Sequence, residues 1–336
     1  MLMTLAGLAA SCRAAEGAGP AGDGRDTLAW RDGPPLPEPV QEIYPALHRD
    51  AIWLAGGFIA QAGRITGPTA ACHRLEKGAD AWRSGPSLPR PRHHPHLRSH
   101  GGRLYALAGF EATGPGAAWV MQAGGWRLDE VGGDWIAAPT LPAPMGEAVT
   151  ASLGEGLHIA TGRTPRGAAN ANWNDHVDSG QHFVLTGPDT AWQTAAPCPT
   201  PRNSATAEII DGLWHVVGGR TVDGGNTTAH EVYDPREDRW RRAAPLPQGQ
   251  GGLASGVLAG KLYAFGGEFF EGEGGVYADC WAYDPARDSW TEAPAMTTPR
   301  HGLGGISWQG GIWAIGGAGE RGGNATSATV EILGPA

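Results

Sequence analysis

The 336-residue chain has little cysteine, no long apolar run beyond its first residues, and no block of like charges. Its four cysteines (Cys12, Cys72, Cys198, Cys280) are far apart and form no Cys-x-x-Cys pair, so neither a disulfide framework nor a cysteine zinc site is predicted. No later apolar run approaches 18 residues, so we expect no transmembrane segment. With a formal charge of −9 and no basic stretch, we expect no nucleic-acid partner.

Motifs of several enzyme classes are also missing. The sequence has no Gly-x-Ser-x-Gly elbow of a serine hydrolase and no glycine-rich phosphate loop ending in Lys-Ser or Lys-Thr. Glycine pairs such as "GGRTVDGG" fit tight turns and do not indicate a nucleotide site.

Glycine, proline and tryptophan, in contrast, are abundant. The 54 glycines and 27 prolines indicate either low complexity or a protein built from many tight turns. Fourteen tryptophans exclude disorder, because disordered segments are poor in aromatic residues. The chain is therefore expected to be ordered and rich in turns.

The N-terminal residues 1–27 are set apart from the rest. "MLMTLAGLAASCRAA" resembles the apolar part of a secretory signal, although it lacks a positively charged start. "LAASC" resembles a lipoprotein cleavage box ending at Cys12. We expect a flexible, signal-like segment and a periplasmic or secreted protein, with lipid attachment at Cys12 left open, and a single domain over residues 28–336.

A repeat of about 50 residues organises that domain. Short apolar runs such as "IWLAGG" and "LYAFGG" close on a glycine six times, and a tryptophan lies 27 residues before each closing glycine. The tryptophans are Trp30, Trp82, Trp135, Trp192, Trp240 and Trp290, and the glycines are Gly57, Gly109, Gly162, Gly219, Gly267 and Gly317. Six equal spacings indicate six copies of one structural unit.

The unit resembles the kelch repeat, in which apolar residues and a Gly-Gly pair precede spaced Tyr and Trp. "YDP" precedes Trp240 and Trp290, and Pro-rich turns such as "GPSLPRPR" follow most of the tryptophans. Each unit reads as four short strands, which predicts an all-β, six-bladed kelch β-propeller. The last unit stops after "ATVEILG", so we expect the N-terminal strand "LAWRDG" with Trp30 to complete the last blade and close the ring.

One face of this propeller is predicted to carry function. The loops that follow each Gly-Gly pair and the Pro-Arg turns should share that face, and their residues differ from blade to blade. Variable loops on a repeated scaffold usually carry binding. The longest of these loops contains "ANANWNDHVDSGQH" at residues 169–182, which we expect to form a wall of a cup.

The candidate ligand-binding residues come from this loop and from equivalent repeat positions. The arginines that follow proline have a second interpretation, in which they tie blades together, and the loop asparagines have one as turn caps. Trp173 would offer a flat face to a sugar. The candidates are Arg92, His93, His94, Trp173, Asn174, Asp175, His176, Arg202, Asn203, Arg220 and Arg300.

Among kelch enzymes, the exported six-bladed N-acetylneuraminate epimerases, or sialic acid mutarotases, are the ones this chain resembles. The resemblance implies arginines that hold a sugar carboxylate and groups that move protons during ring opening. We assign Glu268 and His301 as the candidate catalytic residues. The alternative is a non-enzymatic module that docks a protein or glycan on the same face, and we expect a monomer in either case.

Metal and redox chemistry have weaker support. Asn174-x3-Asp178-x3-His182 resembles the Glu-x3-Asp-x3-His motif of iron-binding kelch specifier proteins, but Asn replaces the Glu. The chain also resembles galactose oxidase-like kelch proteins, whose copper site needs tyrosine ligands in seven blades. Here four of the six tyrosines occupy structural repeat positions. We therefore expect no metal and no cofactor.

Overall fold

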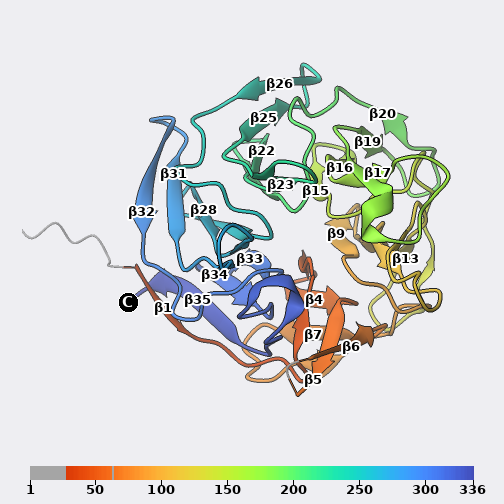
Figure 1. Cartoon of the computed structure of the whole chain (residues 1–336), viewed down its shortest axis with the longest axis horizontal. Coiled ribbons are helices and arrows are strands. Elements are labelled where there is room, and N and C mark those ends of the chain that lie inside the picture. Colours follow the sequence, from red (N-terminus) through yellow and green to blue (C-terminus); the bar gives the residue numbers. More distant parts are fainter. Residues whose placement is uncertain (1–27, 63) are drawn as a thin grey trace, which may run out of the picture.

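A computed structural model describes residues 28–62 and 64–336. The signal-like segment 1–27, with Cys12, lies outside the described residues. The described chain forms six four-stranded antiparallel sheets arranged as a ring around one axis (Figure 1). The six-bladed propeller expected from the repeat is confirmed.

The blades follow one another in the chain. In blades 1 to 5 the strands pair in chain order, whereas the outer strand of blade 6 comes from the N-terminal end; the first strand named below for each blade is nearest the axis. Blade 1 comprises β3 (Ala46–His48), β4 (Ala51–Ala55), β7 (Cys72–Glu76) and β8 (Arg83–Ser84); blade 2 comprises β9 (His96–His100), β10 (Arg103–Leu107), β13 (Trp126–Leu128) and β14 (Ile136–Ala137); blade 3 comprises β15 (Val149–Leu153), β16 (Gly156–Ala160), β19 (His182–Leu185) and β20 (Gln193–Thr194). Blade 4 comprises β21 (Thr206–Ile210), β22 (Leu213–Val217), β25 (His230–Asp234) and β26 (Arg239–Arg242); blade 5 comprises β27 (Ala254–Leu258), β28 (Lys261–Phe265), β31 (Cys280–Asp284) and β32 (Ser289–Ala293); blade 6 comprises β33 (Gly304–Trp308), β34 (Gly311–Ile315), β35 (Val330–Pro335) and β1 (Leu28–Asp32).

Blade 6 joins the two ends of the chain. β1 pairs antiparallel with β35, with Leu28 opposite Pro335 and Trp30 opposite Leu333. Figure 1 shows β1 beside β35 and the C-terminus. The N-terminal strand therefore supplies the outer strand that the last repeat lacks, as the sequence predicts.

Small hairpins stand on one face of the ring, built from the loops that follow each Gly-Gly pair. They hold the residues that the next section describes, together with the two single-turn 3-10 helices η1 (Trp173–Asp175) and η2 (Arg321–Gly323). The hairpin strands are β2 (Val40–Gln41), β5 (Phe58–Gln61) and β6 (Arg64–Pro68); β11 (Phe110–Glu111) and β12 (Val120–Met121); β17 (Arg163–Pro165) and β18 (His176–Asp178); β23 (Arg220–Thr221) and β24 (Gly225–Asn226); β29 (Glu268–Phe269) and β30 (Gly275–Val276).

The repeated tryptophans fasten each blade to the one before it. Each indole Nε1–H donates to a main-chain carbonyl four residues after the preceding repeat tryptophan, at 2.7–2.9 Å. The sixth bond crosses the ring closure, from Trp30 to Pro294. The other five run from Trp82 to Pro34, Trp135 to Pro86, Trp192 to Pro139, Trp240 to Ala196 and Trp290 to Ala244.

The hydrophobic core lies between the blades and not inside any one sheet. Six buried clusters fill the six gaps between neighbouring sheets. In the cluster between blades 6 and 1, for example, Ile52 and Leu54 pack with Trp313 and Ile315. A blade alone would leave both faces of its sheet in water, so the blades stabilise one another by burying apolar area.

Two of these gaps contain buried histidine pairs. His158 and His182 in blade 3 are 2.9 Å apart between ring nitrogens, and His215 and His230 in blade 4 are 3.0 Å apart. Burial lowers the pKa of these histidines, to about 3 for His215 and about 4 for the other three. In blade 5 the equivalent positions hold Tyr263 and Cys280.

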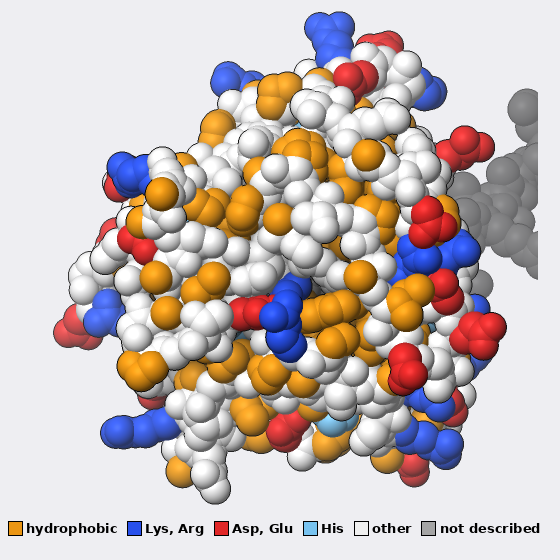
Figure 2. Space-filling model, turned by 90° about the vertical axis from the view of Figure 1, so that its right-hand side faces the viewer, with side chains coloured by type: hydrophobic (Ala, Val, Ile, Leu, Met, Phe, Trp, Pro, Cys, Tyr) orange, Lys and Arg blue, Asp and Glu red, His pale blue; other side chains and the backbone are white. Residues whose placement is uncertain are grey.

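The outer wall of the ring carries no single-sign patch on the side drawn in Figure 2. Acidic and basic side chains there stand singly or next to one another, with apolar side chains between them. Within the described residues no helix is long and apolar enough to cross a membrane. The three described cysteines, Cys72, Cys198 and Cys280, are buried free thiols.

Trp30→Phe tests the bond across the closure. The variant loses the Nε1–H donated to Pro294 and should lose about 1 kcal/mol of unfolding free energy, the usual net value of one hydrogen bond. Trp281→Phe is the matched control, because the indole nitrogen of Trp281 is buried without a hydrogen-bond partner among the described residues. Urea unfolding measures both; equal losses would contradict the proposed role of the Trp30 bond.

The histidine pairs predict a loss of stability in mild acid. Their pKa values in the folded protein lie below the 6.5 of an unfolded histidine, so the unfolded chain binds more protons between pH 6.5 and about 4. The unfolding free energy should therefore fall as the pH drops through that window. The double variant His215→Tyr/His230→Cys installs the pair of blade 5, and should flatten this pH dependence. An unchanged slope would show that the pair does not titrate this way.

Candidate functional site

A cavity of about 490 Å³ opens on the hairpin face, at the axis of the ring. We call it the cup. Its lining includes six ionisable side chains, one from each of the six repeat units: Glu42, His94, Glu147, Arg220, Glu268 and His301. Two further carboxylates, Asp223 and Glu271, also line it.

Two repeat positions deliver five of these side chains to the axis, and His301 lies one residue before the first of these positions. One lies 12 residues after each repeat tryptophan, and the other directly follows the closing glycine. The first position gives Glu42, His94, Glu147, Ser204, Gly252 and Gly302; the second gives Phe58, Phe110, Arg163, Arg220, Glu268 and Ala318.

The first of these positions has a left-handed backbone in every blade. Two blades place glycine there, at φ 69° and 58°, but Glu42, His94, Glu147 and Ser204 adopt φ between 48° and 57°. This conformation costs a residue with a side chain roughly 1–2 kcal/mol. Strained backbone of this kind gathers at functional sites, where the structure needs the side chain in that place.

Main-chain hydrogen bonds tie this position around the axis. The amide of Glu42 donates to the carbonyl of Gly302 at 2.6 Å, and the amide of His94 donates to Glu42 at 3.1 Å. Three further links run from Ser204 to Glu147, from Gly252 to Ser204 and from Gly302 to Gly252. The floor of the cup is therefore a nearly continuous ring of backbone, which fixes its side chains at short range.

The hydrogen bonds of two adjacent histidines determine a charge in the cup. His93 Nε2 lies 2.9 Å from the carbonyl of Ala118, which can only accept, so Nε2 carries the proton. Burial lowers the pKa of His93 well below 6.5, so the ring is neutral and its Nδ1 must accept from His94 Nδ1 at 2.8 Å. His94 Nε2 faces a Glu42 oxygen at 2.9 Å and must also donate. His94 is therefore an imidazolium ion.

Glu42 and Glu147 are the carboxylate partners of this cation. Burial alone would raise the pKa of Glu42, but the charge and hydrogen bond of His94, with His301 and Arg220 nearby, lower it to about 2. Burial likewise opposes the ionisation of Glu147, and Arg163 and His94 together bring its pKa below the usual value. Both side chains are thus ionised.

Glu268 organises the opposite side of the floor. It accepts from Arg220 at 2.5 Å and from the Gly322 amide at 2.8 Å. His301 Nδ1 lies 3.5 Å from Glu268 and 3.9 Å from Glu42, while His301 Nε2 donates to the carbonyl of Glu320 at 3.0 Å. His301 Nδ1 has no hydrogen-bond partner among the described residues, so it is available to a ligand.

Arg163 lies beneath the long loop. Its Nε donates to Glu147 at 2.8 Å, and its two terminal nitrogens are buried without a partner among the described residues. The ring of Trp173 covers the guanidinium at 3.7 Å and also lines the cup. A cation under an aromatic face is stabilised by the ring quadrupole. Trp173 therefore separates a free arginine fork from the cup.

Apolar side chains form the upper wall and the rim. Phe58, Trp119 and Ile65 line one part of the cup, and Phe270 lies 5.5 Å from the Arg220 guanidinium carbon on the other. Phe270 is 51% exposed and Ile65 38%. The cup thus combines a charged floor with flat apolar walls, which is typical of sites for small polar ligands.

The structure brings five of the candidate residues into the cup: His94, Trp173, Arg220, Glu268 and His301. It does not bring the three arginines that follow proline there. Arg92, Arg202 and Arg300 are buried, donate to backbone carbonyls of their own blades, and pair with Glu111, Glu231 and Glu331. These contacts fit a structural role, but one that joins strands within a blade and not one blade to the next.

The other loop and turn candidates lie behind the lining. Asp175 accepts from the amides of Ala171 and Asn172 and caps η1, and Asn174 beside it does not line the cup. His176 is fully buried in β18. His93 is sandwiched between Phe58 and Phe110, and Asn203 donates to Asp178 at 2.6 Å.

Three important residues are not among the sequence candidates: Glu42, Glu147 and Arg163. A repeat alignment contains the signal for the two glutamates. At the position 12 residues after each repeat tryptophan, two blades have glycine and four have a residue with a side chain. The glycines indicate a left-handed backbone, and a side chain kept at such a position indicates a functional role. Arg163 occupies the same repeat position as Arg220 and Glu268, the residue that directly follows the closing glycine.

The described residues contain no group of three or more His, Cys, Asp or Glu side chains arranged to hold a metal ion. The loop residues of the iron-site motif have different partners. Asp178 accepts hydrogen bonds from Asn203 and from the Val222 amide, and His182 belongs to the buried histidine pair of blade 3.

Six four-stranded blades closed by their own termini define a six-bladed β-propeller. The kelch-motif family model matches residues 251–297, which span blade 5 and its approach. This segment therefore carries a kelch motif, and the six equal spacings of Trp and Gly repeat the same pattern along the rest of the described chain.

Two known proteins are similar to this chain. The "Kelch-like protein terF" of Aspergillus terreus is 25% identical over 186 residues, which cover 54% of this chain and 39% of that protein. The match thus spans about two fifths of the relative's length. The solved structure of YjhT superposes with a TM-score of 0.74 at 16% identity, covering 88% of this chain and 95% of that one, and shows the shared fold.

Glu42→Gln tests the buried ion pair. The amide leaves the buried His94 with only the more distant Glu147 carboxylate, at 3.8 Å, so the protein should lose about 3 kcal/mol or more of stability. Urea unfolding measures this loss. Glu38→Gln is the control, since Glu38 faces His73 outside the cup. Equal losses in the two variants would contradict the buried ion pair.

Proposed function

We propose that the cup binds a small sugar acid and that the protein exchanges its anomers by opening and reclosing the sugar ring. The observation that carries the proposal is the floor of the cup. It unites ionised carboxylates, an arginine and a histidine with a free ring nitrogen beneath flat apolar walls.

The size and depth of the cup favour a small ligand. A volume of about 490 Å³ falls within the range of small-molecule sites and suits one sugar unit better than a flat docking surface. Glu147, Glu268 and His301 on its floor are each less than 3% exposed. Electrostatic interactions are stronger in such a desolvated place than at a surface.

The charges of the cup admit a carboxylate despite the net charge of −9. Each of the three buried carboxylates has a cationic partner: Glu42 pairs with His94, Glu147 with Arg163 and Glu268 with Arg220. Two further carboxylates, Asp223 and Glu271, line the cup. Arg220 Nε has no partner among the described residues, and Arg163 has two such nitrogens beneath the ring of Trp173. An arginine fork binds a carboxylate in a bidentate way, which fixes its orientation.

His301 is the group that would move protons. Its Nε2–H is committed to Glu320, so its free Nδ1 can take the proton of the anomeric hydroxyl as the bond from the anomeric carbon to the ring oxygen breaks. The resulting imidazolium faces Glu268 and Glu42 and can return that proton to the ring oxygen. Both oxygens are bonded to one carbon, so a single imidazole can serve both, and reclosure from either side yields either anomer.

Arg220→Gln tests carboxylate recognition. The loss of a charged hydrogen bond should weaken binding of N-acetylneuraminate about 10- to 100-fold and leave binding of a neutral hexose unchanged. Thermal-shift titration with both sugars and a hexuronate measures this. Arg220→Lys keeps the charge without the fork and should fall between the two. Equal losses for the acid and the neutral sugar would argue against a carboxylate on Arg220.

His301→Gln tests the proton transfer. General acid–base groups typically contribute about 10²- to 10⁴-fold, so anomer exchange measured by proton NMR should fall by at least about 100-fold while the Kd changes little. His73→Gln, at a partly buried contact with Glu38 outside the cup, is the control and should keep full activity. Undiminished exchange in His301→Gln would remove this residue from the mechanism.

A second candidate function rests on the rim. Phe270 and Ile65 are large, exposed apolar side chains at the mouth of the cup, as expected of a surface that docks a protein or glycan. Absence of a thermal shift with every sugar in the panel would favour this candidate. Phe270→Ser should then weaken capture of the partner and leave the fold intact.

Export to the periplasm or beyond remains part of the proposal. Its support is the apolar, signal-like sequence of residues 1–15 alone. Mass spectrometry of the mature chain from a cell fraction would show whether this segment is removed and whether Cys12 carries lipid.

A further inference from the structure

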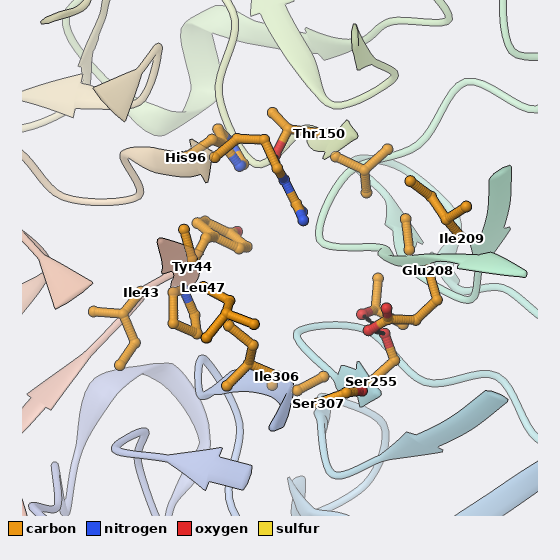
Figure 3. Close-up of a pocket in the computed structure, with 18 of the residues that line it drawn as sticks. Ile43, Tyr44, Leu47, His96, Thr150, Glu208, Ile209, Ser255, Ile306 and Ser307 are labelled. Carbon is orange, nitrogen blue, oxygen red and sulfur yellow. Dashed lines mark hydrogen bonds between the residues drawn. The ribbon is translucent and has the colours of Figure 1, made fainter. Parts of the chain in front are cut away.

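A second cavity of about 280 Å³ lies on the axis, enclosed by the innermost strands of the blades, and we call it the axial cavity (Figure 3). It shares no lining residue with the cup. Ile43, Leu253 and Leu303 line both the axial cavity and the narrow space next to Glu42, so apolar side chains separate the two sites.

The axial cavity contains two charged side chains at one level of the ring. Arg98 on β9 and Glu208 on β21 pair with Tyr105 and His215, which are equivalent residues of the second strands. They therefore face the axis at the same height from blades 2 and 4. The other blades place uncharged residues at this level: Ala46, Ala151, Gly256 and Ile306.

These two charges do not neutralise one another directly. Among the described residues Arg98 forms no ion pair within 4.0 Å, and its recorded hydrogen bond runs from Nε to Thr150 Oγ1 at 3.3 Å. The Nη1 and Nη2 ends of the guanidinium are thus left to face the cavity. An arginine brought to the axis without a carboxylate partner points to an anionic ligand.

Glu208 sits within a row of hydroxyl groups. One of its oxygens accepts from Ser255 Oγ at 3.1 Å, and Ser255 in turn lies 2.6 Å from Thr206. Burial raises the pKa of Glu208 to about 7, and Arg98 opposes that rise. Figure 3 shows Glu208 and Ser255 on one side of the cavity, with His96 and Thr150 on another and Leu47 and Ile306 closing the apolar side.

We propose that the axial cavity is a second ligand site, which takes a small carboxylate bearing a hydroxyl or ammonium group. The carboxylate binds the terminal nitrogens of Arg98, and the donor group binds Glu208. The volume of about 280 Å³ limits the ligand to about nine heavy atoms, since it equals that of about nine waters.

Three compounds of one size test this chemistry: propionate, lactate and alanine, which differ at the second carbon by hydrogen, hydroxyl and ammonium. We expect lactate and alanine to bind more tightly than propionate in NMR chemical-shift titrations. Alanine should gain on lactate as the pH rises through neutrality and Glu208 ionises. The other titratable or charged groups that face this cavity are Tyr44, His96 and Arg98.

Variants assign the site. Arg98→Gln should weaken binding of lactate and alanine about tenfold or more, and Glu208→Gln should remove the preference for alanine. Ser255→Ala is a milder second variant in case either fails to fold, and should weaken both ligands. Arg220→Gln in the cup should change neither.

Three outcomes would overturn the proposal. They are binding of none of the compounds, equal binding of propionate and the other two, and loss of binding in Arg220→Gln with retention in Arg98→Gln. The last would place the ligand in the cup and leave the proposed function of the cup standing.

Discussion

One hydrogen bond, made six times, holds this ring together. The indole of each repeat tryptophan reaches back to a carbonyl of the preceding blade, while the aromatic ring fills the gap between the two sheets. The same residue thus sets the distance between blades and satisfies a carbonyl in the outer turn. Because the sixth bond joins Trp30 to Pro294, no blade is free of a neighbour on either side. Every axial side chain owes its position to this spacing.

The fold was predictable from the sequence because it repeats. The constant spacing of 27 residues between Trp and Gly predicts that every unit forms the same blade. The last unit lacks a fourth strand, which predicts that β1 completes it. The site was only partly predictable, because its residues differ from blade to blade and the repeat does not specify them. Arg92, Arg202 and Arg300 recur in three blades, and this recurrence fits their role in tying strands together. Glu42 and Glu147 stand out only after all six units are aligned at a position where two blades use glycine.

The cup and the axial cavity show two ways of placing charge on one axis. In the cup, left-handed residues and the hairpins bring ionisable groups close together, and Glu42, Glu147 and Glu268 each meet a cation. In the axial cavity, regular strands place one arginine and one glutamate two blades apart, and the distance keeps them from pairing. Strained backbone and close packing fix the charged side chains of the cup. In the axial cavity, the alternation of side chains along regular strands alone places Arg98 and Glu208.

The pairing of β1 with β35 also affects how the chain is made. Residues 28–32 leave the ribosome first and their partners last, and at about 5–20 residues per second some 300 residues take on the order of 15–60 s. During that interval five blades can form in order, but β1 lacks the three inner strands of the sixth blade, and Trp30 has no carbonyl to bind until Pro294 is made. The ring therefore remains open until β35 has been made. A nascent chain of this protein would present an unpaired strand edge at each end, and a holding chaperone would find its binding sites there.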